Sequence, residues 1–291
     1  MATWTTDDLL RLDHEYASAG VPLHQRPFRA ALRLLGGGFV LGPYGNPEIK
    51  RITEAYAALI PEVREVWPGA GIGLVISVDQ VRKFALPVAF GARRPIALWE
   101  ALGFQSRDNW WQWCRRDLRI AAESSFAVAD VGDLFAGIDR VSPSEALTLW
   151  RMAGSNLEDV SNALPLAFSV DSVTQPICLT VELALKGALV TVGADPKSFK
   201  GAPGHDLVAL AKEVSRAVPH RDDALIAKVV ARLPPYVQSR YSPGGLRRLD
   251  VVRLALGAQF IAASMLRRST GEDSALQMEI AEWPGLRPEL P

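Results

Sequence analysis

The sequence predicts a mainly α-helical protein in which an N-terminal helical domain packs on a C-terminal up-and-down helical bundle. First, apolar residues recur at three- and four-residue intervals along most of the 291 residues, which is the spacing of one helical face. Second, helix-start signals precede several of these stretches, the clearest being Asn46-Pro47-Glu48 and Ser142-Pro143-Ser144-Glu145. Third, the near-continuous apolar run from Ile177 to Val192 is typical of a buried central helix.

Short helices are expected in the first part of the chain. Thr5 and Thr6 precede two acids and open the first helix, which Gly20 ends. Pro27 opens the second, which closes at the triplet Gly36–Gly38. No Gly-Lys-Ser or Gly-Lys-Thr follows this triplet, so a flexible turn is favoured over a phosphate-binding loop. The Asn-Pro-Glu signal opens the third helix.

Alternating glycines at Gly69, Gly71 and Gly73 resemble a dinucleotide-binding loop only superficially. That loop requires its glycines after a strand and before a helix. Here the β-branched apolar run up to Val78 follows the glycines instead. The run therefore predicts a buried short strand or an apolar helix, and no cofactor is expected.

A Trp- and Arg-rich stretch follows, and Asp108 is the expected cap of its helix. Its members are Trp110, Trp111, Trp113, Arg115, Arg116 and Arg119. Such a set can stack on and clamp single-stranded nucleic acid. The favoured interpretation is a Trp-rich contact between domains, covered by the stems of the Arg side chains.

Three segments are expected from these signals: a helical domain at 1–141, a helical bundle at 142–270 and an acidic, Pro-containing tail at 271–291. Ser142 is the expected cap of the first bundle helix, which runs to about Ala163. The last bundle helix is expected from about Leu246 to Arg268, with basic residues on its outer positions. The tail is expected to be partly disordered or to fold back over this helix.

Composition narrows the functional classes. The formal net charge is zero, so the whole chain is not an obvious polyanion binder. The two cysteines, Cys114 and Cys178, lie in apolar contexts that indicate buried free thiols in a reducing compartment. We find no signal peptide, no apolar run of the roughly 18 residues that span a bilayer, and no metal-ligand spacing. These observations favour a soluble cytoplasmic protein with no membrane contact and no metal.

Three motifs in order occupy the stretch from Thr174 to Ser242. They are Glu182/Leu185/Lys186 on one helix, His205/Asp206/Leu207 at the start of another, and Arg240/Tyr241 in a Pro-rich loop, with Ser242 before Pro243. This order resembles the HEPN family of helical bundles, in the branch that accompanies minimal nucleotidyltransferases, where E-x-x-L-K, His-Asp-Leu and Arg-Tyr-Pro follow one another. The resemblance covers roughly residues 150 to 270.

The catalytic motif of the RNA-cutting members of that family is absent. They resemble one another in an Arg followed after four to six residues by His, which together hold phosphate charge and move a proton. No His follows Arg240, and the pair Arg216 and His220 is one residue too close and contains Pro219. The resemblance therefore implies a non-catalytic binding or scaffold protein of a bacterial antiviral-defence or toxin–antitoxin module. The implied partners are a second copy, a protein encoded in the same operon, RNA or a nucleotide.

The candidate ligand-binding residues are Arg240, Tyr241, His205, Lys186, Arg247 and Arg248. Arg beside Tyr in a loop suits phosphate and base contacts, but both side chains can equally serve the fold, with Arg240 bonded to carbonyls at helix ends. The favoured interpretation of His205 is a helix-entry residue. The alternative function is a metal-independent ribonuclease with a rearranged site, in which Arg240 acts with His205 or His220.

Overall fold

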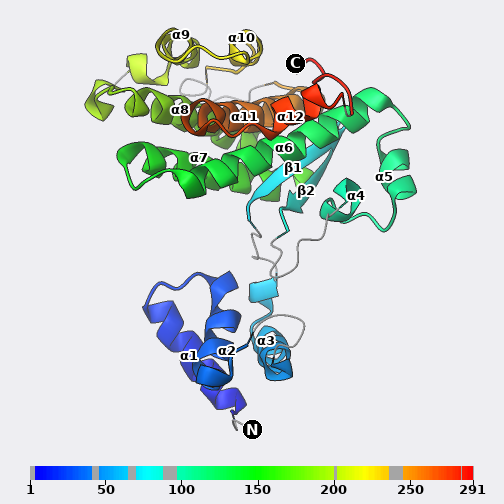
Figure 1. The fold of residues 1–291 in the computed structure, drawn as a ribbon, viewed down its shortest axis with the longest axis vertical. Helices are drawn as coiled ribbons and strands as arrows, with labels where there is room; N and C mark the ends of the chain where they lie inside the picture. Colours follow the sequence, from blue (N-terminus) through cyan, green and yellow to red (C-terminus); the bar gives the residue numbers. More distant parts are fainter. Residues whose placement is uncertain are drawn as a thin grey trace. The chain divides into compact units, whose positions relative to one another are not determined.

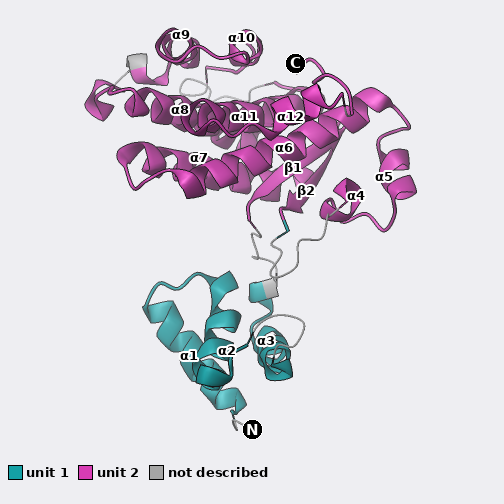
Figure 2. Ribbon diagram, viewed as in Figure 1, with its two compact units in different colours: residues 1–69, 87–95 teal, residues 70–86, 96–291 magenta. Residues whose placement is uncertain are grey.

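The computed structural model describes residues 4–40, 46–64, 70–87, 97–199, 202–235, 245–282 and 284–290. Clustering of contacts divides the chain into two compact units (Figures 1 and 2). Unit 1 comprises residues 1–69 and 87–95, and unit 2 comprises residues 70–86 and 96–291. The expected boundary between residues 141 and 142 thus falls inside unit 2.

Unit 1 contains the helices α1 (Thr6–Ser18), α2 (Arg26–Leu35) and α3 (Pro47–Leu59). Their caps agree with the sequence: Thr5 forms a capping box with Asp8, and the Asn46 side chain accepts a bond from the backbone of Glu48. The small core contains Leu9, Leu12, Ile52 and Tyr56. Within it the Tyr56 hydroxyl donates to Asp13 at 2.6 Å, and Arg26 pairs with the same carboxylate at 3.0 Å.

Unit 2 is a bundle of four long helices beside a two-stranded antiparallel hairpin (Figure 1). The strands are β1 (Ile72–Ser77) and β2 (Gln80–Ala85), paired from Ile72 opposite Ala85 to Ser77 opposite Gln80. The long helices are α6 (Leu118–Arg140), α7 (Glu145–Ala163), α8 (Asp171–Thr191) and α11 (Arg248–Thr270). The shorter helices are α4 (Leu98–Ala101), α5 (Arg107–Trp113), α9 (Leu207–Ala217), α10 (Asp223–Val230) and α12 (Ser274–Ile280).

The mainly α-helical class is confirmed. Of the two alternatives for the run after the alternating glycines, a buried short strand or an apolar helix, the structure has the strand. Every residue of β1 is buried. A Cβ at Gly71 would lie 2.1 Å from the Phe135 ring, and one at Gly73 would lie 2.2 Å from Val131. These two glycines therefore allow β1 to approach α6 closely, which accounts for their presence without a bound dinucleotide.

Two expected helix caps are wrong. The structure begins α7 at Glu145, with Ser144 rather than Ser142 accepting the bond from the Leu147 backbone at 3.2 Å. It begins α5 at Arg107, capped by Ser106 rather than Asp108. In both places neighbouring Ser and Asp residues are all suitable N-caps, and N-cap propensity alone does not predict which of them caps the helix.

The C-terminal tail folds back onto unit 2 over its described residues. After α12, Arg287 forms ion pairs with Asp130 of α6 and lies over the rings of Phe126 and Phe260 at 4.7 and 4.8 Å. Leu290 is buried against the bundle. An Arg that pairs with a carboxylate and stacks on aromatic rings is a strong anchor for an end segment.

Two helices of unit 2, α8 and α11, are long and apolar enough to cross a membrane by length and composition, contrary to the expectation of no such run. However, 72% and 83% of their most apolar windows are buried inside the structure. Core helices meet the same criteria, so this finding is weak support for a membrane span.

Candidate functional site

The centre of the candidate site is the ion pair that α8 places between Glu182 and Lys186. The two residues are one helical turn apart, and Lys186 Nζ lies 2.6 Å from Glu182 Oε1. Both side chains are buried in unit 2. A buried charge is costly without a partner, so this ion pair offsets part of the cost of burying both side chains.

His205 joins this pair from a different segment. It ends the short turn Ala202–His205, and the next residue, Asp206, caps α9 by accepting a bond from the Ala209 backbone at 3.0 Å. His205 Nδ1 lies 3.0 Å from Glu182 Oε2, while 39% of its side chain is exposed. The Glu182 carboxylate therefore lies between a buried ammonium and a partly exposed imidazole.

The turn before His205 is built for close approach. Phe199, which ends the preceding turn Pro196–Phe199, has its ring 5.7 Å from Lys186 Nζ. A Cβ at Gly204 would lie 1.8 Å from the Phe199 carbonyl oxygen, so only glycine fits there. The glycine before His205 therefore has a steric reason, because it allows this turn to pack closely against Phe199.

Arg240 and Tyr241, the leading candidates from the sequence, lie outside the described residues. The last described part of the chain before them is near the site, because the carbonyl oxygen of Pro234 lies 4.0 Å from Cys178 Sγ. Cys178 precedes Glu182 by one turn of α8.

The remaining candidates, Arg247 and Arg248, lie at the start of α11. Arg247 is exposed and pairs with Asp250 at 2.9 Å. Arg248 donates to the Asp79 carbonyl at 3.2 Å and to carbonyls at the end of α7, those of Leu164, Pro165 and Ala167. Arg248 therefore connects the hairpin turn to the segment before α8, which is a role in the fold. Lys186 and His205, in contrast, each contact Glu182 of α8.

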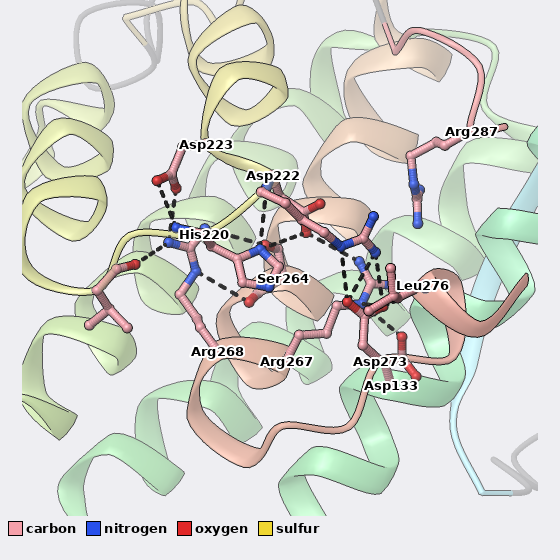
Figure 3. A network of polar contacts seen from close by, with 12 residues as sticks. Asp133, His220, Asp222, Asp223, Ser264, Arg267, Arg268, Asp273, Leu276 and Arg287 are labelled. Carbon is pink, nitrogen blue, oxygen red and sulfur yellow. Dashed lines mark hydrogen bonds and ion pairs between the residues drawn. The ribbon is translucent and has the colours of Figure 1, made fainter. Parts of the chain in front are cut away.

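A buried ionic network was missed by the sequence reasoning. The expectation of basic residues on the outer positions of α11 is wrong for Arg267, because its side chain is 0% exposed. Figure 3 shows the polar contacts around it. Arg267 forms ion pairs with four aspartates from three segments: Asp130 and Asp133 of α6, Asp222 before α10, and Asp273 before α12. The sequence feature that corresponds to this network is an Arg pair that ends the long apolar stretch of α11.

The network also contains His220, the second histidine of the ribonuclease alternative. Its Nδ1 accepts a bond from the Asp222 backbone at 3.3 Å and lies 3.4 Å from Asp222 Oδ2 (Figure 3). The next Arg of α11, Arg268, pairs with Asp223 at 2.9 Å and donates to the Val218 carbonyl at 2.7 Å. These contacts fasten the segment between α9 and α10 onto α11, and His220 serves there in the packing.

Ion pairs and hydrogen bonds lower the pKa values of two aspartates in this network. Burial alone raises the pKa of Asp130, but the charges of Arg287 and Arg267 outweigh it and leave that pKa below its ordinary value. Burial likewise opposes ionisation of Asp222, yet contacts with His220 and Ser264 and the charge of Arg267 lower its pKa well below the ordinary value. Among the described residues, no group of three or more His, Cys, Asp or Glu side chains is arranged to hold a metal ion.

The Trp-rich stretch packs within unit 2. Trp110 is 8% exposed and donates through its indole N–H to Ser124 at 3.4 Å. Trp113 packs against Phe104, with ring centroids 5.5 Å apart. The expected contact between domains is thus, for these two rings, a contact inside one unit.

Comparisons with protein-family models, with curated proteins and with solved structures find no match to this chain.

Proposed function

We propose that this protein is a non-catalytic, HEPN-like binding or scaffold protein that contacts RNA or a nucleotide at the surface around His205. The observation that supports this most is that the Glu182 carboxylate contacts both Lys186 and His205. These two residues belong to two different motifs of the HEPN-like order. The wider expectations, a homodimer and a partner from a bacterial defence or toxin–antitoxin module, belong to the same proposal.

The contacts of Lys186, Glu182 and His205 favour different roles for these residues. Lys186 and Glu182 neutralise each other in a buried pair, so they serve to position His205 rather than to attract phosphate. The partly exposed imidazole can bond to a phosphate oxygen or a base edge. Arg240 and Tyr241, on the segment that follows Pro235, are proposed to supply the phosphate charge and the stacking surface.

The alternative, a metal-independent ribonuclease, is favoured by one contact. A carboxylate 3.0 Å from Nδ1 can hold the imidazole in a fixed tautomer and orientation, as in known hydrolases, with the proton moving at Nε2. Two histidines are considered for this reaction. Of these, His205 has the more exposed side chain, 39% against 18% for His220. His220 is bonded to Asp222 in the buried network.

RNA binding at graded salt tests the proposal. Binding of labelled single-stranded RNA should weaken about tenfold or more between about 50 and 200 mM salt, because Lys and Arg contacts displace counterions. We expect His205→Ala to weaken binding severalfold, and Lys186→Met to do so by removing the ion pair that positions the Glu182 carboxylate beside His205. His14→Ala, an exposed histidine of unit 1, is the matched control and should bind normally. Equal binding by His205→Ala and the control would refute the site.

A further inference from the structure

A groove of about 950 Å³ is lined by residues of α4, α5 and the start of α6 in unit 2. This volume is within the range of small-molecule sites. Figure 1 shows where these three helices lie. The described apolar lining of the groove includes Leu98, Trp99, Trp110, Trp111, Leu118 and Pro284. None of the residues assigned above to the His205 site takes part, so any ligand here is independent of the proposed RNA contact.

Aromatic and exposed apolar surface dominates this groove. Trp99 and Trp111 are half-buried, so part of each indole faces solvent while the rest packs on the core. Leu118, the first residue of α6, is 71% exposed, which is unusual for a leucine beside three tryptophans. An open apolar surface of this kind is a common mark of a binding site.

The charges that line the groove favour a cation. The charged lining residues are Asp108, Glu282 and Arg107, so the formal net charge of the lining is one negative charge. Within the part of the chain that the structure describes, none of the three forms a salt bridge, whereas most acids of unit 2 around α6 and α11 do. Arg115 and Arg116 belong to the following turn and do not line the groove.

The C-terminal tail completes the groove. Glu282 and Pro284 come from the segment between α12 and Arg287, and Arg287 is anchored by its bonds to Asp130 at 2.9 and 2.7 Å. Glu282 and Pro284 line the same groove as the tryptophans of α4 and α5. The groove therefore depends on the tail as well as on the helices.

We propose that this groove binds an organic cation, a ligand with a quaternary or alkylated ammonium group. Indole faces attract such a cation through the ring quadrupole, and tryptophan is the strongest side chain for this contact. Asp108 and Glu282 add charge complementarity without the competition of an existing ion pair. A quaternary ammonium is also weakly hydrated compared with a primary amine, so the apolar walls formed by Leu118 and Pro284 favour it.

Ligand-observed NMR titration of the full chain with choline tests this inference. The neutral isostere 3,3-dimethyl-1-butanol has nearly the same shape without the charge, and benzoate tests an aromatic anion. We expect saturable choline binding at millimolar concentration or below, with the isostere about tenfold weaker. Equal binding of the isostere, tighter binding of benzoate, or no saturable choline binding would each overturn the proposal.

Three variants locate the site. Trp111→Leu should weaken choline binding by about three- to thirtyfold, the range expected for loss of one cation–π contact. Asp108→Asn and Glu282→Gln should each weaken it severalfold, while Asp139→Asn, an exposed acid of α6 outside the groove, should have no effect. Thermal unfolding and circular dichroism confirm that each variant is folded. Unchanged binding by folded Trp111→Leu would place the ligand elsewhere.

Discussion

The side-chain amide of Gln259 on α11 forms the two backbone hydrogen bonds that a neighbouring strand would otherwise form with Leu74 of β1. Gln259 Oε1 accepts from the Leu74 N–H at 3.0 Å, and Nε2 donates to the Leu74 carbonyl at 3.2 Å and to the Ala127 carbonyl of α6 at 2.9 Å. Because β1 is buried, its unpaired edge needs such partners. One side chain thus joins the hairpin, α6 and α11.

Gln259→Leu should lower the free energy of unfolding by about 2–5 kcal/mol, because three buried backbone groups lose their partner. Urea unfolding monitored by circular dichroism measures the change. Gln277→Leu, an exposed glutamine of α12, is the control and should change stability by no more than about 0.5 kcal/mol. A Gln259→Leu protein as stable as this control would show that the edge of β1 has other partners.

Stability should fall in acid through the network around Arg267. The pKa values of Asp130 and Asp222 lie below the ordinary value of 3.8 in the folded state, so these groups contribute stability above about pH 4 that is lost as the pH falls below it. Arg287→Met removes one charge that lowers the pKa of Asp130. Its urea midpoint should therefore fall less than that of the wild type between pH 6 and pH 3. Parallel curves would contradict the assignment.

The hairpin turn contains a strained residue. Val78 has a φ of 61°, a left-handed conformation that is unfavourable for a β-branched side chain. Val78→Gly should raise the free energy of unfolding by about 0.5–2 kcal/mol, since relief of strain exceeds the added chain entropy of glycine. Val81→Gly within β2 is the contrasting variant and should destabilise. Loss of stability in Val78→Gly would mean that the turn is not strained.

Both thiols should be inert in the folded protein. Burial raises the pKa values of Cys114 and Cys178 to about 12, so at pH 8 almost no reactive thiolate is present. Ellman's reagent should label neither cysteine in native buffer and both in guanidinium chloride. Rapid native labelling of Cys178, which contacts the Pro234 carbonyl, would indicate that the segment near Pro234 opens readily.

Local signals predicted much of the fold. The caps at Thr5 and Asn46, the helix start at Asp206 and the buried run after Gly71 and Gly73 all depend on residues close in sequence. Such features follow from propensity and spacing, which a single sequence contains.

Long-range features were not predictable in this way. The bonds between Gln259 and Leu74 span 185 residues, and those between Arg267 and Asp133 span 134. Periodicity shows that a helix has a buried face but not which helix covers it. An Arg in an apolar helix was therefore assigned to the surface, although four aspartates surround it. The order of the motifs indicates that Glu182 and His205 are both candidates, but it does not predict their contact. Residue spacing within each helix does not show that the start of α9 lies beside α8.

The central claim is a non-catalytic RNA contact at His205, and one gel tests it most directly. Mixed RNA is incubated in EDTA with the wild type, with His205→Ala and with Arg240→Ala, and cleavage and mobility shift are read together. The account predicts intact RNA that the wild type shifts and both variants shift less. RNA cut by the wild type and spared by His205→Ala would contradict it and establish the ribonuclease alternative.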